Sequence, residues 1–233
     1  MTTLDELLDY IFDSKKSALY PDLESWLRSS RRFRAFATRN RTKIRAKLKN
    51  VQDEGGMKDL RAELETAALL LGSERFTVEY EKYAASKQRG PDFTVTFKTH
   101  TLFNVEVRRI RKVELEEEDP DARVGKLMAV LCEKVGQMPP SIVNLLWLTA
   151  ERPIAEDDLS RAVTTLRQMA EHKAEDFFKR RGFASAVDFI WQYSRLSGIV
   201  LHQSGKNMIW VNALARHKVP PEIVATIQRL ETI

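Results

Sequence analysis

The chain has 233 residues, which is enough for one sizeable core with a small accessory unit. Two full domains are not expected at this length. Its 43% hydrophobic and 30% charged residues are typical of globular proteins and exclude a disordered or fibrous class. The single cysteine, Cys132, excludes an intrachain disulfide and a thiolate zinc site. The acidic N-terminus lacks a signal peptide, and the longest apolar run is too short to span a bilayer. We therefore expect a cytoplasmic protein that does not enter a membrane.

Residues 1–55 predict a basic, helical N-terminal region. The net charge of +5 is unevenly spread, because ten basic residues and no acid occur between Trp26 and Gln52. Aromatic side chains, among them Phe33 and Phe36, interleave with the basic ones and would serve as apolar anchors on a surface that follows nucleic-acid phosphates. The residues expected on this surface are Arg28, Arg31, Arg32, Arg34, Arg39, Arg41, Lys43 and Arg45. A solvated helix face or an interface with an acidic protein is the alternative interpretation.

Residues 56–233 are expected to form the main α/β unit, after a break in the helical region at Gly55-Gly56. Its first part predicts a helix, three strands, a helix and a strand, at residues 57–71, 75–83, 92–97, 102–110, 122–135 and 141–149. The acidic run at 114–121 predicts a solvated loop. The remainder predicts helices over 156–196, short strands at 198–202 and 208–212, and a last helix through Leu230.

Two of the expected strands place polar residues on one face. In residues 91–97 and again in 103–108, apolar and polar residues alternate, which is typical of half-buried strands. Asp92 belongs to the polar set of the first strand, and Glu106 and Arg108 belong to that of the second. On a hairpin, the two carboxylates can approach closely enough to hold a hard cation such as Mg²⁺. A shared face requires that paired residue numbers add up to an even value, near 198 or 200.

This order of elements, together with its acids, resembles the PD-(D/E)xK nuclease superfamily, which has the restriction-endonuclease-like fold. The resemblance covers about residues 57–149 and implies a mixed sheet flanked by helices, here with a helical N-terminal extension. In that family, the aspartate of a Pro-Asp pair, an acid of a following strand and an acid on the first helix bind one or two Mg²⁺ ions. The corresponding residues here are Asp92, Glu106 and either Glu63 or Glu65. Helical geometry favours Glu63, which flanks the buried stripe of its helix.

Arg108 stands where the family motif has a lysine. A guanidinium stays protonated, so it cannot act as a general base, although it can clamp a phosphate with two hydrogen bonds. The role of the lysine then falls to the metal alone or to another cation such as Lys126, or the site binds without cutting. By the same resemblance, the carbonyl of Val107 would complete the metal shell, and Arg109 and Arg111 would extend the substrate path.

The resemblance therefore implies an endonuclease that hydrolyses phosphodiesters of nucleic acid, DNA rather than RNA, with Mg²⁺ or Mn²⁺. Its catalytic residues would be Glu63, Asp92, Glu106 and Arg108. Nucleases of this fold often work as homodimers, and the sequence is compatible with that state. One alternative is a catalytically impaired module that binds nucleic acid without cutting it. Another is a protein-interaction scaffold that binds neither nucleic acid nor metal.

Overall fold

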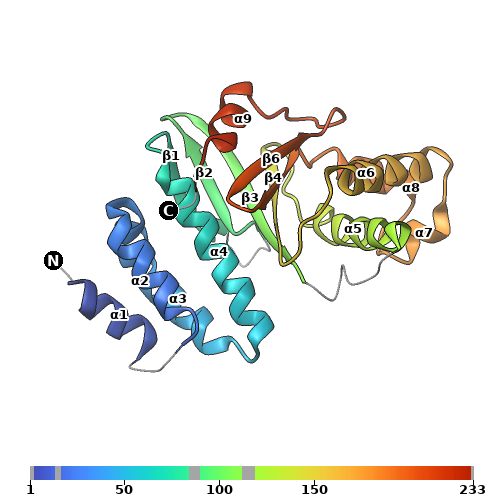
Figure 1. The fold of residues 1–233 in the computed structure, drawn as a ribbon. Helices are drawn as coiled ribbons and strands as arrows, with labels where there is room; N and C mark the ends of the chain where they lie inside the picture. The colour runs from blue at the N-terminus through green and yellow to red at the C-terminus, as the bar shows by residue number, and fades with distance from the viewer. Residues whose placement is uncertain (1–2, 14–16, 84–89, 112–118, 232–233) are drawn as a thin grey trace.

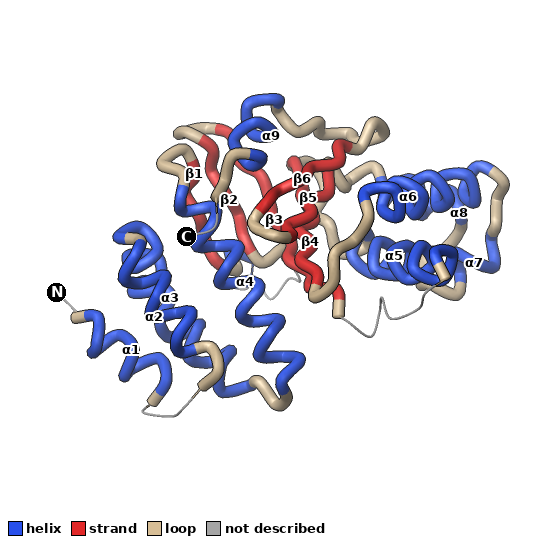
Figure 2. The backbone as a smooth tube through the Cα atoms, in the orientation of Figure 1, coloured by secondary structure: helices blue, strands red, loops and turns tan. Residues whose placement is uncertain are grey.

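Six strands form one mixed sheet with helices packed on both of its faces (Figures 1 and 2). The computed structural model describes residues 3–13, 17–83, 90–111 and 119–231. The expected α/β class, with a mixed sheet flanked by helices, is confirmed. None of the described helices combines the length and apolarity needed to cross a bilayer.

In the described part of the chain, four helices precede the sheet. They are α1 (Leu4–Phe12), α2 (Tyr20–Ser29), α3 (Arg31–Asn50) and α4 (Glu54–Gly72). The expected break at Gly55-Gly56 is wrong, because both glycines lie in the first turn of α4. The side chain of Asp53 accepts a hydrogen bond from the Gly56 amide at 2.6 Å and caps the helix there. A favourable cap one turn earlier thus outweighs the low helix propensity of two glycines.

The remaining elements follow the expected order with small shifts at their ends. They are β1 (Phe76–Tyr80), β2 (Phe93–Phe97), β3 (Thr101–Ile110), α5 (Pro120–Val135), β4 (Val143–Ala150), α6 (Glu156–Glu171), α7 (Glu175–Lys179), α8 (Ala186–Tyr193), β5 (Gly198–Gln203), β6 (Lys206–Val211) and α9 (Pro221–Gln228). Most of the acidic run expected as a loop, residues 114–118, lies outside the described residues. Asp119, at its end, caps α5 through its side chain.

The strands lie in the order β1-β2-β3-β4-β5-β6. The first three are antiparallel neighbours, β3, β4 and β5 run parallel, and β6 is antiparallel to β5. Between β2 and β3, Phe93 faces Val105, so paired residue numbers add up to 198. The register required for Asp92 and Glu106 to share a face is therefore confirmed.

Each face of the sheet carries its own hydrophobic core. The core of one face includes residues of α1 to α4 and α9 with those of the strands, and the core of the other face includes residues of α5, α6 and α8. The N-terminal helices belong to the first core, because Phe36 on α3 packs against Tyr80 and Phe93, with ring centroids 5.8 and 6.4 Å apart. Residues 1–55 thus share a core with the sheet.

Candidate functional site

A pocket of about 450 Å³ opens beside β3, at the point where β2 begins. Because β2 starts opposite Val105, its pairing with β3 ends there and leaves the later residues of β3 beside the pocket. Side chains from α4 and α5, which cover opposite faces of the sheet, reach the same opening around this edge. The structure brings together here all of the expected catalytic residues and the expected metal-binding backbone group, namely Glu63, Asp92, Glu106, Val107 and Arg108.

The Asp92 carboxyl interacts with both of the other acids of this pocket. Its Oδ2 accepts a hydrogen bond from the backbone amide of Val107 at 2.7 Å. Burial, followed by the nearby charges of Glu63 and Glu106, raises the pKa of the Asp92 carboxyl well above its ordinary value, against the opposing effects of the Val107 amide and Lys47. Protonation of Asp92 is therefore favoured by its burial first and by its two acidic neighbours second.

Glu63 is held on the α4 side of the pocket by two groups that the sequence did not indicate. Its Oε2 accepts a hydrogen bond from the Tyr80 hydroxyl at 2.7 Å and pairs with Lys47 Nζ at 2.6 Å. Lys47 also bonds Glu81 at 2.9 Å. Burial raises the pKa of Tyr80, and the charge of Glu63 raises it further. For Lys47, the carboxylates outweigh the burial that lowers its pKa, so the pKa is raised.

Glu106 pairs with Lys134 of α5, whose Nζ lies 2.8 Å from Oε1. Both side chains are nearly buried, with 10% of Glu106 and 13% of Lys134 exposed. The cation at the strand acid is thus Lys134, whereas the sequence suggested Lys126, more than two helical turns earlier. In the sequence, Lys134 flanks the buried stripe of α5 next to Val135, which only weakly indicates that its side chain faces the sheet. Sequence alone could not tell which turn of this helix faces Glu106.

The arginines that follow Glu106 have different roles. Arg109 is buried and bonds Asp59, Glu151 and the carbonyl of Gly55, each at 2.9 Å. The Arg109 guanidinium therefore connects β3 to the first turns of α4. Arg111 pairs with Asp59 at 3.2 Å and is half-exposed at the rim of the pocket. Arg108 donates a hydrogen bond to the carbonyl of Arg109.

Glu65, the other candidate on α4, lines a different pocket. Among the described residues, no group of three or more His, Cys, Asp or Glu side chains is drawn together tightly enough to form a ready metal site. Instead, Lys47 and Lys134 each bind one of the acids.

The aromatic residues of the basic block are core residues. Trp26, Phe33 and Phe36 are 6%, 0% and 3% exposed. The expectation that they anchor nucleic acid is therefore wrong, because their helical spacing places them on the inner face of α2 and α3, where burial of large apolar side chains is favourable.

Many cations of the block also act within the fold. Arg32, Arg34, Lys43 and Arg45 donate to backbone carbonyls, with Arg32 reaching Leu71 at 2.7 Å and Lys43 reaching Tyr80 at 2.8 Å. Arg28 pairs with Glu24, and Arg41 lies over the Tyr10 ring.

Among the exposed arginines of α3, Arg31 and Arg39 make no hydrogen bond, ion pair or contact with an aromatic ring within the described part of the chain. They are two helical turns apart on one side of the helix.

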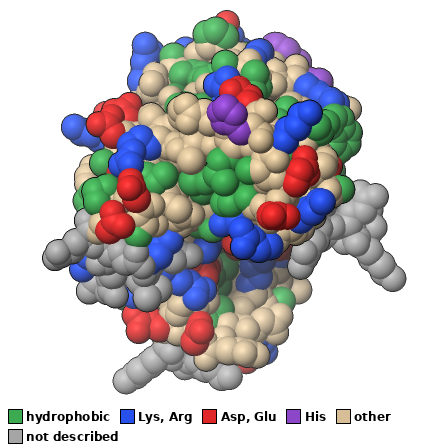
Figure 3. Space-filling model, turned by 90° about the vertical axis from the view of Figure 1, so that its right-hand side faces the viewer, with side chains coloured by type: hydrophobic (Ala, Val, Ile, Leu, Met, Phe, Trp, Pro, Cys, Tyr) green, Lys and Arg blue, Asp and Glu red, His purple; other side chains and the backbone are tan. Residues whose placement is uncertain are grey.

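On the face of the molecule drawn in Figure 3, acidic and basic side chains are interspersed. That face therefore carries no broad surface of one charge.

No family model, no curated protein and no solved structure matches this chain. What the pocket can do therefore rests on its own geometry.

Proposed function

We propose that the chain is a metal-dependent endonuclease of the PD-(D/E)xK type, which hydrolyses phosphodiesters of DNA with Mg²⁺ or Mn²⁺. The observation that carries this proposal is the convergence of three carboxylates, Glu63, Asp92 and Glu106, on one pocket at the edge of β3. They come from α4, from the residue before β2 and from β3 itself.

The groups in the pocket fit a hard cation. Lys47 and Lys134 each bond one oxygen, Glu63 Oε2 and Glu106 Oε1, which leaves the second oxygen of each carboxylate for a ligand role. The Val107 amide points to Asp92, and the N–H and C=O of one strand residue point to the same side of the strand. The Val107 carbonyl therefore also faces the pocket. Mg²⁺ and Mn²⁺ prefer such oxygen ligands.

A divalent ion bound here would stabilise charge on the scissile phosphate and lower the pKa of a water molecule. The protein itself supplies two cations beside the acids. Lys134 holds Glu106 in position and places an ammonium group where a phosphate oxygen or the attacking water can be bound. Arg108 lines the same pocket and offers a guanidinium for the phosphate.

A cleavage assay on supercoiled and linear DNA tests the proposal. Wild-type protein should cut with Mn²⁺ or Mg²⁺, and Asp92→Asn or Glu106→Gln should slow cleavage by at least about 100-fold, the usual effect of losing a main charge-stabilising group. Glu65→Gln is the matched control, because Glu65 lies on the same helix as Glu63 but lines another pocket. The proposal is wrong if neither DNA nor RNA is cut with either ion.

One observation favours a second candidate, a module that binds nucleic acid without cutting it. Glu63 is already held by Lys47 and Tyr80, and an arginine occupies the position of the motif lysine. Such a module should bind DNA in a strongly salt-dependent way and should be indifferent to Mn²⁺ and to Glu106→Gln. Gel shifts with and without Mn²⁺ separate the two candidates.

A further inference from the structure

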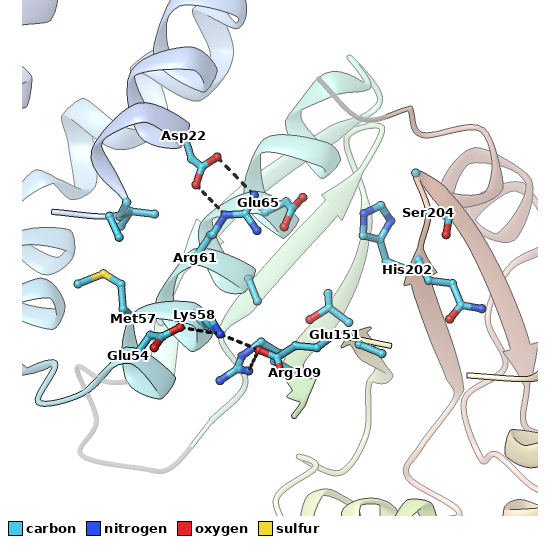
Figure 4. A pocket seen from close by; sticks show the side chains of 17 residues that line it. Asp22, Glu54, Met57, Lys58, Arg61, Glu65, Arg109, Glu151, His202 and Ser204 are labelled. Carbon is cyan, nitrogen blue, oxygen red and sulfur yellow. Dashed lines mark hydrogen bonds and ion pairs between the residues drawn. The ribbon is translucent and has the colours of Figure 1, made fainter. Parts of the chain in front are cut away.

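A second pocket, of about 570 Å³, lies over the carboxyl ends of the parallel strands β3, β4 and β5 (Figure 4). It is walled by α2, by α4 and by the turn between β5 and β6. Ligands of open α/β sheets bind beyond the carboxyl ends of the strands. The volume of this pocket lies within the range of pockets that bind small organic molecules. This space is not part of the proposed metal site, because Glu63, Asp92 and Glu106 line the other pocket.

The floor of this second pocket is a row of polar side chains. Arg109, Thr149 and His202 are direct neighbours across the three parallel strands. Two residues earlier on each strand, the corresponding row is apolar and belongs to the buried core, with Val107, Trp147 and Val200. Polar groups therefore replace the core at the level where the pocket begins.

The hydroxyl of Thr149 is the first of two groups that point to a ligand. Thr149 is 9% exposed, and within the described residues its Oγ1 has no hydrogen-bond partner. A buried hydroxyl without a partner is unfavourable for stability, and such groups are rare in folded proteins. A ligand in the pocket would supply the missing partner.

His202 is the second group, and its hydrogen-bond network fixes how it faces the pocket. Its Nδ1 lies 2.8 Å from Asn207 Oδ1. Because Asn207 Nδ2 donates to the carbonyls of Ile227 and Leu230, Asn207 Oδ1 must accept, and Nδ1 of His202 must carry the hydrogen. Nε2 of the neutral ring is then an acceptor, and the ring extends from β5 toward α4 (Figure 4).

The charges around the pocket argue against an anionic ligand. Lys58 pairs with Glu54 and Glu151, Arg61 with Asp22, and Arg109 with Asp59 and Glu151. Apolar side chains fill much of the remaining wall, namely Leu19, Met57, Ala62 and Ala150. A flat, uncharged ring suits these walls.

We propose that this pocket binds a flat heterocycle through a lactam edge, the adjacent N–H and C=O found in uracil, thymine and guanine. The ring N–H donates to His202 Nε2, and the neighbouring carbonyl accepts from the Thr149 hydroxyl. Strands lie about 4.8 Å apart, so groups on neighbouring strands can contact adjacent atoms of one ring.

Calorimetric titration with thymidine at about pH 8 tests this. Thymidine should bind the wild type, and 3-methylthymidine, which lacks the ring N–H, should bind at least about tenfold more weakly, as for one lost hydrogen bond in a pocket. Thr149→Val, which keeps the shape of the side chain, should weaken thymidine binding similarly. This variant should melt no lower than the wild type, because the hydroxyl it removes has no hydrogen-bond partner among the described residues.

Asp92→Asn should bind thymidine as the wild type does, so the outcome is independent of the metal pocket. The proposal is overturned if thymidine, uridine and guanosine all fail to bind. It is equally overturned if they bind but Thr149→Val, His202→Phe and methylation of the ring nitrogen change nothing. A protein that binds thymidine and cuts no nucleic acid would contradict only the endonuclease proposal.

Discussion

Asp92 combines a buried position with two acidic neighbours, and its raised pKa has a consequence for stability. Between the ordinary carboxyl pKa and the raised native value, the folded protein binds more protons than the unfolded chain. The stability of the wild type therefore falls as pH rises through that window. Asp92→Asn removes the charge and keeps an oxygen that can accept from Val107.

We therefore expect Asp92→Asn to stabilise the protein at neutral pH by about 1 kcal/mol, a gain typical of relieving a functional site. For a chain of this size, the melting temperature should rise by about 2–4 °C. The difference from the wild type should shrink as pH falls below the window. Calorimetric scans across acid and neutral pH measure it, and a variant less stable at every pH would contradict the account.

Lys134 is the lysine that pairs with Glu106, whereas the sequence suggested Lys126 as one possible cation, and this pairing leads to a separate prediction. Lys134→Met should slow DNA cleavage by about 100-fold or more, since a positioned charge is lost from the reacting phosphate. Arg108→Lys, which restores the family motif, should change the rate by less than about tenfold, because Lys134 already holds Glu106. Single-turnover cleavage rates measure both. A large gain from Arg108→Lys would show that position 108 is the important one.

At the scale of elements, the alternation of apolar and polar residues predicted β2 and β3, and the even sum of paired residue numbers that a shared face requires is the one observed. A slip of one residue would exchange the two faces of a strand and take Phe93 out of its contacts with Phe36 and Tyr80. Such patterns could not reveal Lys47, Tyr80 or Lys134. These side chains reach the site from other elements, and their placement depends on packing between layers.

The basic block of α2 and α3 shows the same limit. Its composition suggested a nucleic-acid surface, yet Arg32 and Lys43 are used to bond carbonyls at the ends of α4 and β1. Charge in a sequence does not tell which cations satisfy buried backbone groups. Arg31 and Arg39 are exposed on α3 and are available for phosphate contacts.

We expect the double variant Arg31→Gln, Arg39→Gln to weaken DNA binding and to reduce the dependence of log K on log salt by about 2, roughly one for each lost phosphate contact. Its melting temperature should stay unchanged. Arg32→Met is the control, since it should lower stability by about 1.5–3 kcal/mol through lost charged hydrogen bonds. Fluorescence anisotropy at several salt concentrations gives the slope. An unchanged slope would exclude this face of α3 as the DNA contact.

At the scale of the whole molecule, the N-terminal helices and the sheet share one hydrophobic core, so we expect them to unfold together. Phe36 lies in the core between α3 and the strands and is 3% exposed. Phe36→Ala should lower the free energy of unfolding by about 3–5 kcal/mol, the usual effect of such a cavity. Val187→Ala is the control at a side chain that is 70% exposed, and should change stability by less than about 0.5 kcal/mol.

Urea unfolding of these variants should remain a single transition by circular dichroism and by tryptophan fluorescence. Two separate transitions would show that residues 1–55 fold independently of the sheet. That result would restore the N-terminal region as a unit of its own.

The central claim is that Glu63, Asp92 and Glu106 together hold a divalent ion. Calorimetric titration of Mn²⁺ into wild type, Asp92→Asn and Glu65→Gln tests it most directly. We expect the wild type and Glu65→Gln to bind one or two ions each. We also expect an affinity at least about tenfold weaker for Asp92→Asn, as is usual when a ligand carboxylate is lost. No binding by the wild type, or equal binding by all three proteins, would contradict the claim.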